Sequence, residues 1–81
     1  MEVGQDVVDV EVRNRSLHRR ALRDLELPLG VLILSIRRQG KVILSHGYTR
    51  LRLGDWVTVV GSNENLEQLL LRFEDQTDGV R

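Results

Sequence analysis

The stretch YTRLRLGDWVTVVG (Tyr48–Gly61) runs from alternating arginines and leucines through a Gly-Asp pair into a second alternating run. Glycine tolerates a left-handed backbone, and an aspartate side chain can accept hydrogen bonds from turn amides. Gly54 and Asp55 therefore predict a turn that leads into a strand. Trp56 is out of phase with the valines that follow it, so we expect its side chain on the opposite face, as an anchor for a partner or as a cover for the sheet edge.

Three more strands are predicted around this one. Val8, Val10 and Val12 alternate with charged residues, which indicates a half-buried strand. Residues 31–36 (VLILSI) are apolar without alternation, which favours a central strand covered on both faces. The glycine turn in residues 37–41 (RRQGK) then predicts an antiparallel hairpin with the short strand that follows it.

Two helices complete the predicted set. Ser16 can cap a first helix, whose apolar residues recur at helical spacing until Pro28 ends it. Ser62 or Asn63 can cap a second helix. Its apolar stripe consists of Leu66, Leu69, Leu70 and Phe73.

These elements predict an α+β fold with two layers, in which a small four-stranded, mainly antiparallel sheet packs with two helices in the order β-α-β-β-β-α. A chain of 81 residues has room for one core, so we expect a single domain over residues 1–81. Its core is predicted at residues 7–74, with a frayed tail at 75–81.

Composition excludes several classes of function. Twelve basic residues balance twelve acidic ones, so no overall field attracts nucleic acid or anionic lipid. The absence of cysteine excludes disulfides and thiolate metal sites. The longest apolar run has six residues, whereas a membrane helix needs about 20, so the chain itself is expected to be soluble.

No set of catalytic residues is apparent in the sequence, since catalysis needs complementary groups and none of the known nucleophile, zinc or phosphate-loop motifs is present. We therefore predict neither an enzyme, nor a metal site, nor a cofactor. His46 could contact a ligand or lie solvated in a loop. The arginines between Arg13 and Arg23 could contact phosphates, but nearby carboxylates and the lack of aromatic residues favour a solvated surface, and nucleic acid is not predicted.

Arg37 and Arg38 end the most apolar strand, and the residues alone leave two interpretations open. The guanidinium groups could receive an anionic ligand, or they could pair with carboxylates of neighbouring elements.

The order of these motifs resembles the TrkA-C domain, the C-terminal domain of RCK (regulator of potassium conductance) proteins. The likeness spans residues 8–73 and includes an apolar strand that ends in arginine before a glycine turn, a T-x-L-x-x-G-D segment at residues 49–55, and a strand that ends in glycine. Three positions depart from the family pattern: Arg19 replaces a glycine, Ser45 a proline and Tyr48 an acidic residue. Ser35 and Val42 stand where relatives that bind cyclic di-AMP between two subunits carry an acidic residue and an asparagine.

The resemblance implies a cytoplasmic regulatory domain of a potassium or other cation channel or transporter, near the inner face of the membrane and paired as a homodimer. A small anionic ligand such as a nucleotide would bind at the dimer interface and change transport. The predicted ligand-binding residues are Arg37, Arg38, His46, Gly47, Tyr48 and Thr49. The alternative is a structural dimerisation module without a ligand. A dinucleotide-binding half usually precedes the domain, and no G-x-G-x-x-G motif occurs here, so the chain is either a fragment or part of a membrane protein.

Overall fold

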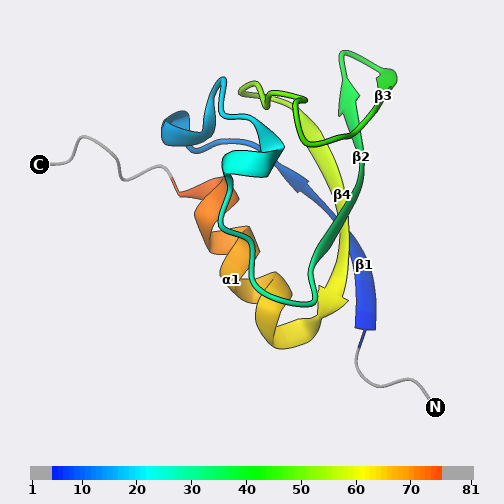
Figure 1. Cartoon of the computed structure of the whole chain (residues 1–81), viewed down its shortest axis with the longest axis vertical. Helices are drawn as coiled ribbons and strands as arrows, with labels where there is room; N and C mark the ends of the chain where they lie inside the picture. The colour runs from blue at the N-terminus through cyan, green and yellow to red at the C-terminus, as the bar shows by residue number, and fades with distance from the viewer. Residues whose placement is uncertain (1–4, 76–81) are drawn as a thin grey trace, which may run out of the picture.

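The computed structural model describes residues 5–75, which form one four-stranded sheet with a helix on one face (Figure 1). The strands are β1 (Gln5–Glu11), β2 (Leu32–Arg38), β3 (Lys41–Leu44) and β4 (Trp56–Ser62), and the α-helix is α1 (Asn63–Glu74). Their order across the sheet is β1-β4-β2-β3, and each neighbouring pair is antiparallel. The predicted α+β fold, with its antiparallel sheet, is confirmed.

The core lies between the sheet and α1. Val57 and Val59 of β4 and Phe73 of α1 are fully buried, as the alternation of the strand and the helical stripe predict. Ser62 caps α1, and its hydroxyl accepts a hydrogen bond from the amide of Asn65. The buried apolar core consists of Val10, Val12, Leu17, Ala21, Leu25, Ile36, Leu51, Val57, Val59, Leu66, Leu69 and Phe73.

The predicted helix from Ser16 to Pro28 is wrong. The segment contains two short 3-10 turns, η1 (Arg15–Leu17) and η2 (Leu22–Asp24), and Asn14 instead of Ser16 caps the first. The backbone between the turns is interrupted at Arg19, whose φ of 72° is left-handed.

The physical reason is competition for the backbone hydrogen bonds of this segment. Three of its amides bond across to the loop that precedes β4, and others bond three residues back within the 3-10 turns, so no continuous α-helical hydrogen bonding forms. The bonds run from the amides of Arg19, Leu22 and Arg23 to the carbonyls of Leu51, Thr49 and Gly47. The apolar side chains still reach the core, so the helical spacing predicted burial correctly and the backbone conformation incorrectly.

The prediction that residues 31–36 are covered on both faces is also wrong for the single chain. Leu32 is 60% exposed and Leu34 45% exposed, because α1 and the 3-10 turns all lie on the other side of the sheet (Figure 1). The deepest strand is β4, which pairs with both β1 and β2. The bare side is called the outer sheet face below.

The hairpin between β2 and β3 has the turn that its glycine predicts. Arg38 pairs with Lys41, and the two residues between them, Gln39 and Gly40, have φ angles of 54° and 79°. A turn with positive φ at both central positions matches the right-handed twist of the two strands. This turn fixes the pairing register of β2 with β3, which the sequence left open. The predicted tail beyond residue 75 lies outside the described residues.

Candidate ligand-binding site

Arg37 and Arg38 are adjacent in β2 and therefore point to opposite faces of the sheet. Arg37 lies on the outer sheet face, where its Nη2 is 3.6 Å from Oδ2 of Asp9 on β1. Both side chains of this pair are about 44% exposed, so the contact is solvated and weak.

Arg38 makes a stronger pair with Asp55, in the turn before β4. Its Nε donates to Oδ1 of Asp55 at 2.9 Å and its Nη2 to Oδ2 at 2.8 Å. The hydrogen bond to Asp55 raises the pKa of Arg38 above its ordinary value, against the lowering effect of burial. Of the two interpretations left open for these arginines, the structure shows pairing with carboxylates.

The Gly54-Asp55 turn has the conformation that the sequence predicts. Gly54 has a φ of 90°, which favours glycine, and the Asp55 carboxylate also accepts a hydrogen bond from the amide of Arg52 at 2.9 Å. The Asp55 side chain is 1% exposed, so its charge depends on these donors for compensation. This turn therefore fixes Arg38 as well as the start of β4.

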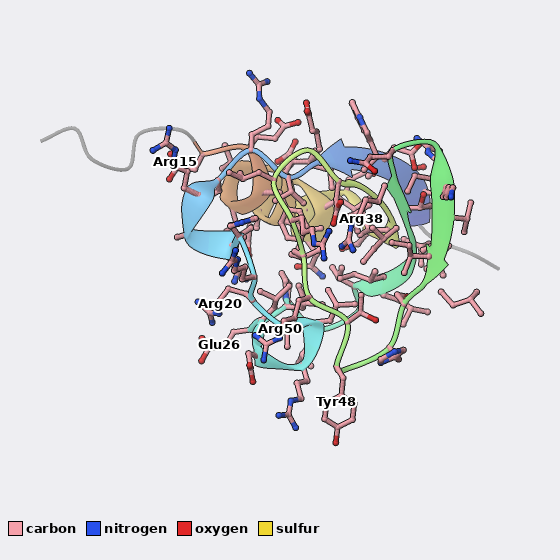
Figure 2. The ribbon with its side chains drawn as sticks, turned by 90° about the horizontal axis from the view of Figure 1, so that it is seen from above. Arg15, Arg20, Glu26, Arg38, Tyr48 and Arg50 are labelled. Atoms are coloured by element: carbon pink, nitrogen blue, oxygen red, sulfur yellow. The ribbon has the colours of Figure 1, made fainter. Side chains whose placement is uncertain are left out.

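Residues 46–49 form a compact turn on the surface. The amide of Thr49 bonds to the carbonyl of His46 at 3.0 Å, and the Thr49 hydroxyl accepts from the amide of His46 at 3.1 Å. The guanidinium of Arg23 lies 4.5 Å from the centroid of the Tyr48 ring, a cation–π contact. Tyr48 lies at the edge of the molecule, with its ring directed outward (Figure 2).

The predicted ligand-binding residues fall into two groups within one chain. Arg37 and Arg38 lie at the turn end of the β2–β3 hairpin, since Arg38 pairs with Lys41. The turn of residues 46–49 follows the opposite end of β3. Figure 2 shows Arg38 in the middle of the view and Tyr48 at its lower edge. The structure does not bring the six residues into one pocket of a single chain.

Sequence reasoning missed a basic pocket on the side of the first 3-10 turn. His18, Arg19, Arg50, Leu51 and Arg52 line a pocket of about 530 Å³. The sequence pattern that could have predicted this pocket is the Arg-Leu-Arg-Leu alternation. It directs Arg50 and Arg52 to the same side, while Leu51 between them is buried. Their meeting with Arg19 depends on the bridge between Ala21 and Arg50, which the pattern does not reveal.

The described part of the chain contains neither a cluster that could hold a metal ion nor a helix that could cross a membrane. Residues 5–75 contain no group of three or more histidine, aspartate or glutamate side chains placed so that they could hold a metal ion. No helix within the same residues has the length and apolar character needed to cross a membrane.

Curated relatives include two proteins with transport descriptions. The chain is 34% identical over 84 positions to an uncharacterized transporter of Bradyrhizobium diazoefficiens, with 90% of this chain and 15% of the relative covered. It is 44% identical over 50 positions to a Trk system potassium uptake protein TrkA homolog of Archaeoglobus fulgidus, with 62% of this chain and 12% of the relative covered. The chain thus spans a small part of each relative.

Solved structures show the same fold. An RCK domain solved with cda superposes with a TM-score of 0.80 at 26% identity, with 84% of this chain and 97% of that chain covered. The RCK C domain of the potassium transport protein KtrA, in complex with cyclic di-AMP, superposes with a TM-score of 0.73 at 20% identity, with 82% and 80% covered. The model of the TrkA-C domain family matches residues 7–74. The chain therefore belongs to the TrkA-C domain family.

Proposed function

We propose that this chain is the cytoplasmic regulatory domain of a potassium or other cation channel or transporter. In this proposal two copies pair as a homodimer, and a small anionic ligand such as a nucleotide binds between them. Membership of the TrkA-C family supports the proposal, as do relatives described as transport proteins and solved neighbours described with bound cyclic di-AMP. We also infer that the chain is not an enzyme.

The observation that carries the proposal is the outer sheet face. Trp56, Val42 and Leu32 on this face are 43%, 65% and 60% exposed, although each belongs to a regular strand. Val7 and Leu32 both pair with Val60, so an apolar row crosses three strands. An apolar sheet face of this kind fits an interface with a second copy.

Arg37 is the residue of this face best placed to meet an anion. It lies opposite Val42 and Trp56, and its long contact with Asp9 leaves the guanidinium half exposed. Arg38 would support the ligand wall from below the sheet, held by Asp55. The turn of residues 46–49 would complete the wall from the partner subunit, since within one chain it follows the opposite end of β3.

The coupling would act through a shift of populations. A ligand held between two subunits favours one relative orientation of the pair, and the attached pore has a different free energy in each orientation. This mechanism requires binding and association but no bond making or breaking. It would operate near the inner face of the membrane.

Sedimentation at rising protein concentration tests the interface. We expect a dimer for the parent chain and a monomer for Leu32→Glu, because the new carboxylate would be buried unpaired in the interface. Leu71→Glu is the matched control, since Leu71 is 73% exposed on α1, in the other layer. A parent chain that stays monomeric, or a dimer lost only in the control, would contradict the proposal.

Thermal unfolding with a panel of nucleotides and cations tests the ligand. A ligand at a hundred times its dissociation constant should add about 2.7 kcal/mol to the free energy of unfolding. Arg37→Gln should remove this gain without unfolding the domain, because Arg37 makes only an exposed ion pair. Flux measurements on a parent transporter carrying the same variant would then test the coupling.

The second candidate is a structural dimerisation module of a transporter with no ligand. The specific observation in its favour is that Arg37 and Arg38 both already have carboxylate partners. A dimer that gains no stability from any member of the panel would support this candidate over the first.

A further inference from the structure

The basic pocket of His18, Arg19, Arg50, Leu51 and Arg52 contains none of the residues of the proposed ligand wall, although it adjoins that wall where Arg38 donates to the carbonyl of Arg50. We propose that it binds a small oxyanion with several negative charges, of the phosphate or polycarboxylate type. The pocket is strongly basic, two of its polar groups are fixed, and its backbone is strained at Arg19, and none of these features depends on the function proposed above.

Charge is the first argument. The chain as a whole has equal numbers of acidic and basic residues, but the lining contains three arginines and no carboxylate. Within residues 5–75, Arg19, Arg50 and Arg52 have no ion pair with a carboxylate within 4.0 Å. The nearby Asp55 is buried and paired with Arg38. Like charges gathered in a concave site favour an anion from solution.

The second argument is that two of the polar groups are held in place. Nη1 of Arg50 donates to the carbonyl of Arg19 at 2.7 Å, which leaves the other N–H groups of this guanidinium available. Nδ1 of His18 accepts from the amide of Leu53 at 3.1 Å, so the ring proton is on Nε2 and can be donated. Fixed donors lose less conformational entropy when a ligand binds.

Backbone strain at Arg19 is the third argument. A φ of 72° is unfavourable for every residue with a Cβ atom, and glycine would adopt it without penalty. The backbone at this position is fixed by the bond from its amide to the carbonyl of Leu51 at 2.7 Å. Arg19 therefore destabilises the fold at the rim of a pocket where its guanidinium has no carboxylate partner. Strain of this kind is common at binding sites.

The pocket also limits the class of ligand. A volume of about 530 Å³ is within the range of small-molecule sites. Its lining contains no tyrosine, tryptophan or phenylalanine, and the imidazole of His18 is its single aromatic ring. Guanidinium groups match the planar pairs of oxygens in phosphate and carboxylate groups, which favours a compact oxyanion over a nucleoside.

Amide chemical-shift mapping by NMR on the full 81-residue chain tests the proposal. The chain is titrated with sodium pyrophosphate, with citrate and with sodium chloride at matched ionic strength. We expect saturable shifts at the amides of residues 18–20 and 50–53 with pyrophosphate, citrate or both, and none with chloride. The stronger of the two ligands identifies the phosphate or the carboxylate type.

Variants separate the pocket from general surface charge. Arg52→Gln should weaken binding about tenfold, because a charge-assisted hydrogen bond is lost. Within residues 5–75 the Arg52 side chain makes no hydrogen bond or ion pair, and its amide still bonds to Asp55, so the fold is retained. Arg15→Gln is the matched control. It removes the same charge from an exposed position that Figure 2 shows well apart from Arg50, and it should change affinity less than twofold.

Three results of the oxyanion titrations would overturn the proposal. They are the absence of saturable shifts with both oxyanions, shifts that map outside the pocket, and equal losses in the two variants. Binding of a short single-stranded oligonucleotide without binding of either oxyanion would also overturn it, since that result would indicate an extended nucleic-acid surface. Arg19→Gly provides a second check, because it should raise thermal stability and still weaken oxyanion binding.

Discussion

The guanidinium of Arg38 contacts both carboxylate oxygens of Asp55, at 2.9 and 2.8 Å, and so joins the end of β2 to the turn that begins β4. A third hydrogen bond, from Nη2 of Arg38 to the carbonyl of Arg50 at 2.9 Å, extends the link to the preceding loop. The pair connects residues that are 17 positions apart in sequence. We therefore expect stability to depend on it.

Asp55→Asn should lower the free energy of unfolding by about 3 kcal/mol, because it breaks a pair whose carboxylate is almost fully buried. Denaturant unfolding followed by circular dichroism measures this loss. Asp9→Asn is the matched control, since its pair with Arg37 is long and exposed, and it should cost less than about 1 kcal/mol. Similar losses in both variants would contradict the special role of Asp55.

Arg38→Met should destabilise at least as much as Asp55→Asn. The Arg38 side chain is 20% exposed and could reach water if its partner were removed, whereas Asp55 would stay buried without its main donor. The same denaturant measurement, made on both variants, gives the order. A smaller loss for Arg38→Met would show that the turn amides alone can compensate the carboxylate.

The pH dependence of the pair follows from the raised pKa of Arg38. A cation whose folded pKa lies above its unfolded value stabilises fully below the unfolded pKa and loses this contribution as pH rises through the folded value. Both values lie at the strongly alkaline end for arginine. We therefore expect the contribution of Arg38 to stability to stay constant through neutral and moderately alkaline pH. The measurement is the free energy of unfolding of the parent chain and of Arg38→Met at several pH values. The difference between the two should not change over this range.

Arg19→Gly should raise the free energy of unfolding by about 1 kcal/mol, because it removes the penalty of a left-handed residue with a Cβ atom. Arg20→Gly, at the next position and with an ordinary φ, should instead lower it through the greater flexibility of the unfolded chain. Thermal unfolding of the two variants should thus shift in opposite directions. A shared direction would show that charge, not backbone conformation, determines the result.

Gly61→Ala should destabilise by about 1 to 3 kcal/mol through overpacking. A Cβ atom there would lie 3.1 Å from the carbonyl oxygen of Gly30 and 3.1 Å from Cγ2 of Val31. Gly47→Ala is the control, since its Cβ would meet Cβ of Arg23 at an ordinary 3.4 Å. Calorimetry of the two variants should show a lower melting temperature only for Gly61→Ala.

The sequence predicted the strands and α1 well because their periodicity has local causes. Alternation in β1 and β4 and the stripe of α1 follow from which side of each element is buried. The first helix was predicted wrongly because Leu17, Ala21 and Leu25 satisfy helical spacing, while several backbone groups between them bond to the 47–51 loop. That competition is a tertiary effect, and no local pattern reveals it.

The candidate site was less predictable than the fold. The pairing of Arg38 with Asp55 and the meeting of Arg19 with Arg50 depend on strand order and register, which the sequence left open. The expectation of a strand covered on both faces came from the apolar residues of β2, including Leu32, which is exposed in the single chain. The apolar pattern of a strand predicts that its side chains are buried. It does not show whether the same chain or a second copy covers them.

The position of β4 between β1 and β2 has a consequence for how the molecule forms. It is the last strand in chain order, so neither of its neighbours can complete its hydrogen bonding until residues 56–62 have left the ribosome. The pairing of β1 with β4 then closes a long loop, since it joins residues as far apart in sequence as Glu11 and Trp56. Contacts over such a sequence separation slow folding, so we expect the sheet to form only after most of the domain has been synthesised.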